Sequence, residues 1–196
     1  GLSDTEYGFL NGPPFALFYA LMGIPIAMLA DRFNRVVIVA IRKDRAEHFD
    51  WPEAHPHNPP TVGETLRDLM AARGWRGADD WADKADEIAP TIVGGSKKHG
   101  GPDLGPTRAR AAWATLGVEG RTLAVEAPDP FHNGMPRLTV PMVARIQGFP
   151  DDWHFTGAKT NAYRQVGNAF PPPVAEAVSA QIARALRKRV LHSVAG

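Results

Sequence analysis

The chain has 196 residues, of which 44% are hydrophobic, so it is long enough to bury the core of one domain or of two small ones. Its 22 Lys and Arg nearly balance its 21 Asp and Glu, and the net charge of +1 means that any basic surface must come from local clustering. The chain contains no cysteine, which excludes disulfides, cysteine-bound zinc and a cysteine nucleophile within these residues and is compatible with a cytoplasmic protein.

The most apolar stretch runs from Phe9 to Ala30 and is interrupted by glycine and proline. Its longest unbroken part, Phe15 to Met22, is too short to span a bilayer, and no basic segment precedes it as in a signal peptide. We expect a short helix over residues 14–22 that is buried or packs on a second copy or another subunit. We expect no membrane contact.

Residues 35–42, with the sequence RVVIVAIR, form a near-continuous β-branched run. Such a run is typical of a strand buried on both faces of a mainly parallel or mixed sheet. The chain from about Ala46 to Pro60 is rich in Pro, His and Asn and is expected at the surface. Its histidines lack partner carboxylates at ligand spacing, so we expect no metal site.

A helix is predicted to begin after Thr61, because Thr61 and Glu64 have the spacing of a capping box. Gly74 is expected to end this helix. Four apolar residues of the helix fall on one stripe: Val62, Leu66, Leu69 and Met70.

Residues 75–136 show no long hydrophobic period. Glycine, proline and charged residues are interleaved there with Trp75, Trp81 and Trp113, which predicts a loop-rich segment held by a few aromatic anchors. An irregular segment of this length is rarely an idle loop, so it indicates a small domain set into a larger fold.

Regular structure is expected to return at Thr139, which can cap a helix over about 140–147 that ends at Gly148. Residues 149–153 are predicted to form a turn, and a last helix is predicted after residues 171–173. One apolar face of that last helix is defined by Val174, Val178, Ile182 and Leu186. Sheet-like residues early and helices late predict an α/β or α+β fragment.

Two segments near the end of the chain carry a more specific pattern. Residues 137–153 read RLTVPMVARIQGFPDDW, and residues 161–174 read NAYRQVGNAFPPPV. In this order they resemble the last two conserved blocks of cytosine-5 DNA methyltransferases, R-x-L-T with A-R-x-Q-G-F-P-D-x-W/Y, then Y-x-Q-x-G-N-A/S-x-x-P-x-V. One departure is Pro136, which stands where the first arginine of R-x-L-T is usual.

A weaker block precedes these two. Gly23-Ile24-Pro25 and Arg32-Phe33-Asn34-Arg35 resemble the family's G-V/I-P-Q-x-R-x-R segment, although Ile26 stands where Gln is usual and the arginines are three apart. The resemblance implies that Arg35, next to the expected strand, contacts the target base as a catalytic-site residue.

The resemblance also implies a domain organisation. Residues 1–45 and 137–196 would belong to the C-terminal portion of a Rossmann-like methyltransferase domain. Residues 46–136, the same irregular insert found above, would be the target-recognition domain that binds double-stranded DNA.

In this family a cysteine thiolate attacks C6 of a flipped cytosine, and C5 then takes a methyl group from S-adenosyl-L-methionine. The Pro-Cys-Gln, Glu-Asn-Val and glycine-rich cofactor segments of the family are not in this chain. The resemblance therefore implies the C-terminal part or a subunit of a DNA (cytosine-5-)-methyltransferase, inactive without an N-terminal half.

Two groups of residues receive roles from the resemblance. The G-N-A-F segment, with Asn168, Ala169 and Phe170, would close over S-adenosyl-L-methionine. Structural or hinge roles fall to Arg145, Gln147 and Asp151; for Gln147 and Asp151 we expect local hydrogen bonds that fix the turn.

The best candidate for DNA contact lies inside the insert. Lys97, Lys98 and His99 precede two glycines, so the backbone can approach DNA while the lysines neutralise phosphates. Arg108 and Arg110 follow, at a spacing that would place both on one side of an extended segment, and arginine can read guanine in the major groove.

Two alternatives to a split enzyme remain open. The chain could be a catalytically inert DNA-binding remnant, or a regulatory partner of a separate methyltransferase. In any of these cases the apolar segment Phe9–Ala30 and the expected strand would pack on a missing sheet, on a partner or on a second copy.

Overall fold

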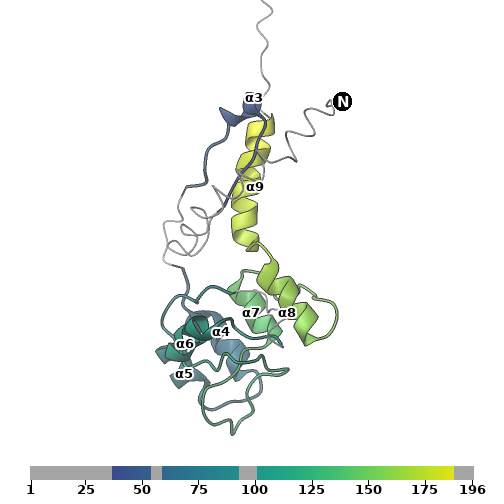
Figure 1. Cartoon of the computed structure of the whole chain (residues 1–196). Coiled ribbons are helices and arrows are strands. Elements are labelled where there is room, and N and C mark those ends of the chain that lie inside the picture. Colours follow the sequence, from purple (N-terminus) through teal and green to yellow (C-terminus); the bar gives the residue numbers. More distant parts are fainter. Residues whose placement is uncertain (1–36, 54–58, 93–100, 188–196) are drawn as a thin grey trace, which may run out of the picture. The chain divides into compact units, whose positions relative to one another are not determined.

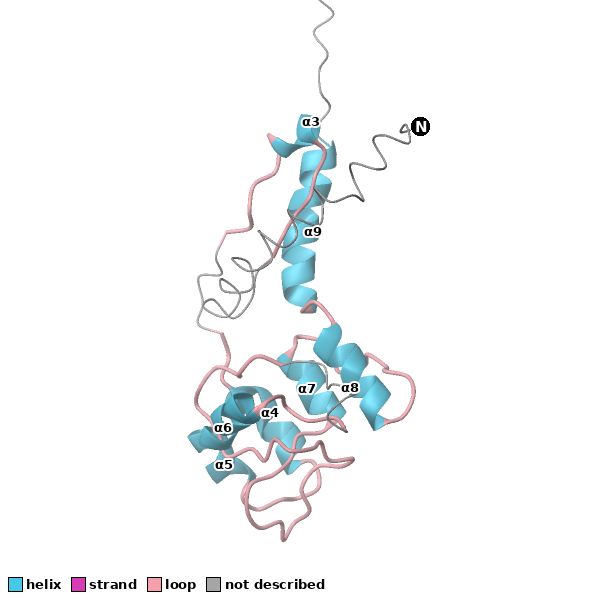
Figure 2. Ribbon diagram, viewed as in Figure 1, coloured by secondary structure: helices cyan, strands magenta, loops and turns pink. Residues whose placement is uncertain are grey.

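The computed structural model describes residues 37–53, 59–92 and 101–187, and all regular secondary structure in these ranges is helical (Figures 1 and 2). The chain divides into two compact units, residues 1–42 and 43–196. The helices of the second unit are, in chain order, α3 (Lys43–Ala46), α4 (Val62–Ala71), α5 (Ala78–Lys84), α6 (Thr107–Thr115), α7 (Val140–Ile146), α8 (Lys159–Asn168) and α9 (Pro172–Arg187).

The strand expected over residues 35–42 is not formed in the described part of the first unit, because residues 37–42 carry no regular secondary structure. A buried strand requires neighbouring strands that pair its backbone N–H and C=O groups. None of the described ranges supplies such a neighbour. The α/β class therefore stays a prediction, and the helix expected over 14–22 lies outside the described residues.

Helix α4 follows the sequence prediction closely. The Glu64 amide donates to Thr61 Oγ1 at 3.2 Å and the Thr61 amide donates to Glu64 Oε2 at 2.8 Å, which confirms the capping box. The predicted stripe is also confirmed, since Leu66 and Met70 are buried. Gly74 adopts a positive φ of 80°, so the chain turns away just beyond the helix.

The α4 and α5 helices approach each other at a glycine. The Gly63 amide donates to the Ala85 carbonyl at 2.9 Å, and the neighbouring Val62 amide donates to Glu87 at 2.9 Å. A Cβ atom at position 63 would overlap the Ala82 carbonyl oxygen and lie 2.8 Å from its carbon. The absence of a side chain at Gly63 therefore allows this close backbone contact.

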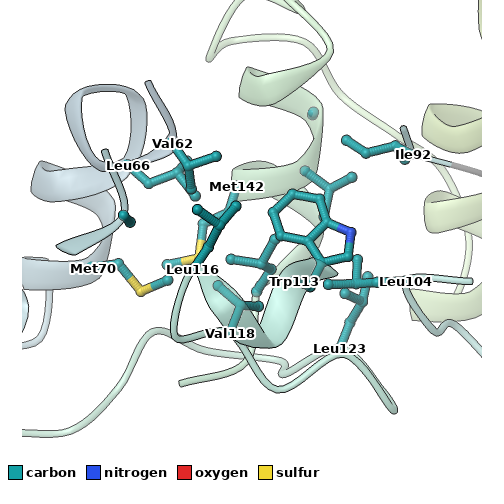
Figure 3. Close-up of a cluster of buried hydrophobic side chains, with 14 of the residues drawn as sticks. Val62, Leu66, Met70, Ile92, Leu104, Trp113, Leu116, Val118, Leu123 and Met142 are labelled. Carbon is teal, nitrogen blue, oxygen red and sulfur yellow. The ribbon is translucent and has the colours of Figure 1, made fainter. Parts of the chain in front are cut away.

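The insert contains two helices, α5 and α6, that its sequence pattern does not predict. The three tryptophans predicted as anchors, Trp75, Trp81 and Trp113, are buried as expected, and Trp113 is fully enclosed. Around Trp113 the side chains of the insert meet those of α7, as Figure 3 shows for Leu104, Leu123 and Met142. The Trp81 indole N–H donates to the Gly117 carbonyl at 3.3 Å, so this anchor also fixes the turn after α6.

The segment after the insert is also as predicted. The Met142 amide donates to Thr139 Oγ1 at 3.4 Å, and Gly148 ends α7 with a φ of 85°. The Trp153 amide donates to the Pro150 carbonyl at 3.0 Å, which confirms the turn.

One hydrophobic core joins the insert to the following segment. Val62 and Trp113 from the insert share it with Leu138, Val143 and Val166, and all five are buried. The α4 and α7 helices pack on one another, and α7 packs on α8. The predicted domain boundary between residues 136 and 137 thus does not separate two hydrophobic cores. The domain assignment made from the resemblance stays a prediction.

Helix α9 begins at Pro172, two residues earlier than predicted, and proline is well suited to the first turn of a helix. Of its predicted apolar face, Val174 and Leu186 are exposed, while Ala185 is the one buried residue in the helix. No helix in the described ranges combines the length and the apolar character needed to cross a membrane.

We expect Gly63→Ala to destabilise the protein by about 1–3 kcal/mol, because the added methyl group must push α4 away from α5. Chemical denaturation of the two proteins measures this loss. The matched control is Gly101→Ala, since a Cβ at Gly101 meets nothing within 4 Å and the change should stay within about 0.5 kcal/mol. Equal stability of both variants would contradict the close contact at Gly63.

Candidate functional site

Arg145 on α7 links three parts of the second unit. Its Nε and Nη2 donate to the two carboxylate oxygens of Asp151 at 2.8 and 2.7 Å. Its Nη1 donates to Asp68 Oδ1 at 2.5 Å and to the Thr65 carbonyl at 3.3 Å. The Arg145 guanidinium therefore connects α7 to α4 and to the turn that follows α7. Its pair with Asp151 has the bidentate geometry common between arginine and a carboxylate.

The charges of this cluster stabilise one another. The hydrogen bonds that Arg145 donates to Asp151 and Asp68 raise the pKa of Arg145, and the same bonds lower the pKa of each carboxyl group. The Arg145 side chain is 21% exposed, whereas both carboxylates are largely exposed. The cation is thus the enclosed member, and the acids cover it from the solvent side.

Gln147 connects the end of α7 to α8. It is buried, and its Nε2 donates to the Val166 carbonyl at 3.2 Å. We expected Gln147 and Asp151 to hydrogen-bond locally, and Asp151 pairs with Arg145 six residues away. Gln147 instead reaches a carbonyl 19 residues along the chain, because α8 packs beside the end of α7.

A cavity of about 370 Å³ opens beside Arg145 and Asp151. Apart from these two residues and His154 its walls are apolar, and they come from α4, α7, α8 and the turn after α7. The other residues that line it are Leu69, Val140, Pro141, Ala144, Pro150, Trp153, Phe155 and Ala162.

The first half of the G-N-A-F segment is helical in the structure, because α8 includes Gly167 and Asn168. Asn168 is the last residue of α8, and the Ala169 amide donates to the Gln165 carbonyl at 3.1 Å. Residues 159–168 thus form a helix that the glycine at position 167 does not interrupt, because Tyr163 and Val166 are buried on its inner face. The Asn168 and Phe170 side chains remain exposed at the α8–α9 junction.

The placement expected for Arg108 and Arg110 is wrong. Both lie on helix α6, where residues two apart point to different sides, whereas we expected an extended segment. Arg108 is exposed, while the stem of Arg110 packs near Gly120 and its Nη2 donates to Thr107 Oγ1 at 3.3 Å. Burial of Trp113 stabilises this helix. The apolar periodicity of α6 is weak, so the sequence did not predict a helix there.

Four other predicted site residues lie outside the described residues. They are Arg35, Lys97, Lys98 and His99. In the part of the chain that is described, no group of three or more His, Asp or Glu could hold a metal ion.

Sequence reasoning overlooked two residues of this region. Asp68 is the second acidic partner of Arg145, and no local pattern connects residues 77 positions apart. Tyr163 is buried, and its hydroxyl donates to the Asp103 carbonyl at 2.7 Å, which ties α8 to the insert. Burial raises the pKa of Tyr163. The one sequence signal that could have identified Tyr163 was its place in the Y-x-Q motif.

Comparisons with known proteins agree on one family. A family model described as C-5 cytosine-specific DNA methylase matches residues 29–184. The chain is 60% identical over 156 residues to Type II methyltransferase M.NaeI of Lentzea aerocolonigenes, and 48% identical over 161 residues to Type II methyltransferase M.NgoMIV of Neisseria gonorrhoeae. No solved structure matches.

The matched relatives are longer than this chain. The two alignments cover 78% and 79% of the chain but 37% and 49% of the relatives. A shorter match, 46% identical over 57 residues, joins 29% of the chain to 4% of DNA (cytosine-5)-methyltransferase 2 of Arabidopsis thaliana. The chain thus spans half or less of the length of these relatives.

We expect Arg145→Met to lower the free energy of unfolding by about 1–2 kcal/mol, because it removes hydrogen bonds to two carboxylates. Arg67→Met is the matched control. Arg67 also pairs with two acids, Asp79 and Asp83, but its side chain is 46% exposed, so the loss should be smaller than that of Arg145→Met. Equal losses would mean that Arg145 forms ordinary surface ion pairs.

The same cluster predicts a pH dependence. The pKa values of Asp68 and Asp151 are lower in the folded state than their usual 3.8. Their contribution to stability is therefore complete above pH 3.8 and is lost as the pH falls through the lower folded values. Denaturation curves between pH 5 and pH 2 should show a smaller loss in Arg145→Met than in the wild type.

Proposed function

Because the chain belongs to the C-5 cytosine-specific DNA methylase family, we propose that it forms the target-recognition and cofactor-closing part of a DNA (cytosine-5-)-methyltransferase. The observation that carries this proposal is the family match over residues 29–184, together with the absence of cysteine from the chain. The family supports a Rossmann-like catalytic domain. The Type II names of the relatives support a place in restriction-modification and in the cytoplasm.

S-adenosyl-L-methionine is the methyl donor of this family, and the α8–α9 junction offers groups that suit it. Asn168 has an exposed amide, and Phe170 has an exposed aromatic ring next to it in sequence. An amide can hydrogen-bond a polar ligand, and a ring can pack on an aromatic base. In the proposed role Asn168, Ala169 and Phe170 hold the cofactor and exclude water from one side of it.

The chemical step needs a thiolate, which this chain does not contain. Arg35 is the proposed contact to the target cytosine. In this proposal three residues act at a distance from the reacting atoms: Arg145, Gln147 and Asp151. Their contacts to α4 and α8 hold the insert and the cofactor-closing helix in fixed positions relative to each other.

Double-stranded DNA is the proposed partner of residues 46–136. Arg108 is exposed on α6 and makes no ion pair within the described ranges, so its guanidinium is available to a base or a phosphate. Arg110 is less accessible, because its stem packs near Gly120. Lys97, Lys98 and His99 complete the proposed contact surface.

The runner-up is a catalytically inert DNA-binding remnant, or a regulatory partner of another methyltransferase. The lack of cysteine is equally compatible with this reading. A partner bearing the cysteine segment, or self-association through Phe9–Ala30, is likewise a proposal.

We expect this chain alone to transfer no methyl group, because no residue can attack C6 of cytosine. Incorporation of tritium from labelled S-adenosyl-L-methionine into mixed-sequence duplex DNA measures the activity. Transfer should appear when a second polypeptide supplies the cysteine-bearing part of the family's catalytic domain, such as the remaining part of the Lentzea relative.

Methyl transfer by the pure chain would overturn the proposal that another polypeptide supplies the catalytic cysteine. No transfer in the reconstituted mixture, combined with intact DNA binding by the chain, would favour the inert reading.

For DNA recognition we expect the lysine and arginine variants to differ. Lys97→Ala with Lys98→Ala should weaken binding to all duplexes and flatten the salt dependence by about two counterions. Arg108→Ala should reduce the preference at one or two base pairs, by about 1–3 kcal/mol if its contact is bidentate. Arg110→Ala should have the smaller effect, and binding to a randomised duplex pool at several salt concentrations separates the cases.

Equal, sequence-independent losses in all of these variants would mean a nonspecific basic surface. The recognition assignment would then have to move elsewhere in residues 46–136.

A further inference from the structure

The loop between α6 and α7 presents apolar side chains to solvent. Phe131 is 79% exposed and Val125 is 80% exposed, and both lie in the stretch that we call the 125–135 loop. An aromatic ring so exposed contributes little to the core, and such residues are characteristic of binding surfaces. The loop lies within the insert, residues 46–136.

The backbone that carries Phe131 is firmly held. Its amide donates to Asp129 Oδ1 at 2.9 Å, and the His132 amide donates to the Asp129 carbonyl at 3.1 Å. The Trp75 indole N–H donates to the His132 carbonyl at 3.0 Å, and the two rings meet edge to face. Because Trp75 is itself buried, the tip of the loop is connected to the core.

An arginine lies over the exposed ring. The Arg76 guanidinium carbon lies 5.4 Å from the centroid of the Phe131 ring, which is the distance of a cation–π contact. Arg76 is exposed and forms no ion pair with any described residue. It comes from the connection between α4 and α5, so the pair joins two segments that lie 55 positions apart.

The acidic residues of the loop are already engaged. Glu126 pairs with Arg73 at 2.6 Å, and Arg73 also donates to the Ala127 carbonyl at 3.3 Å. The Asp129 carboxylate accepts the Phe131 amide. The cation beside the ring is therefore Arg76, which no acid of the loop pairs with among the described residues.

We propose that Phe131 and Arg76 form a DNA-contacting point of the insert. This rests on the proposed function and deepens it, since it names residues for the DNA partner. Phe131 packs against the edge of a base step or a sugar in a groove, and Arg76 pairs with the adjacent phosphate. Apolar side chains next to cations are used in this way on duplex DNA, where the phosphate contact positions the protein. Burial of the ring against DNA also removes its apolar surface from water.

The test compares Phe131→Ala with Val125→Ala in the full chain. The probe is a duplex that the wild-type protein selects from a random-sequence pool, and binding is followed by fluorescence anisotropy. Phe131→Ala should weaken binding by on the order of tenfold with an unchanged melting temperature, because the ring is exposed. Val125→Ala, on the same loop and equally exposed, should change affinity by less than about twofold.

The charge is tested separately at position 76. Arg76→Ala should reduce the slope of affinity against salt by about one counterion, and Arg76→Lys should keep that slope. Wild-type affinity of Phe131→Ala would overturn the proposal, as would a loss of binding that accompanies a lower melting temperature. A wild-type protein that selects no duplex at all would instead overturn the proposed function.

Discussion

The second unit depends on how α7 is attached to its neighbours. Arg145 reaches α4 through Asp68 and the following turn through Asp151, and Gln147 reaches α8 through the Val166 carbonyl. These contacts lie at the edge of a core in which Met142 and Val143 are buried. A partly enclosed cation with two acids keeps its charge at any physiological pH, so the attachment of these elements does not depend on ordinary changes of pH.

This arrangement explains how a loop-rich insert can present side chains in defined positions. Its backbone has few regular elements to order it, so it depends on buried side chains and on hydrogen bonds to carbonyl groups. Trp75, Trp81 and Trp113 supply the burial, and the first two also donate to the loops they cover. Binding loops held by a rigid scaffold lose less conformational freedom when they bind, which suits the role proposed for the insert.

The same helices connect the two proposed ligand surfaces. Helix α8 packs on α7 and ends at Asn168, the first residue of the proposed cofactor segment. The Tyr163 hydroxyl binds the Asp103 carbonyl, so α8 also contacts the insert directly. If the insert moves when it binds DNA, α8 should therefore move with it, because closely packed elements transmit displacements to one another.

Features that depend on neighbouring residues were determined by the sequence alone. The caps at Thr61 and Thr139 and the stops at Gly74 and Gly148 were predicted because each involves a single helical turn. The family was also recognisable, since its blocks are contiguous. Tertiary structure decided the rest: whether Arg108 lies on a helix, which acid meets Arg145, and which cation covers Phe131. Those outcomes follow from packing between segments far apart in the chain, and such separations leave no periodicity or spacing from which they could be read.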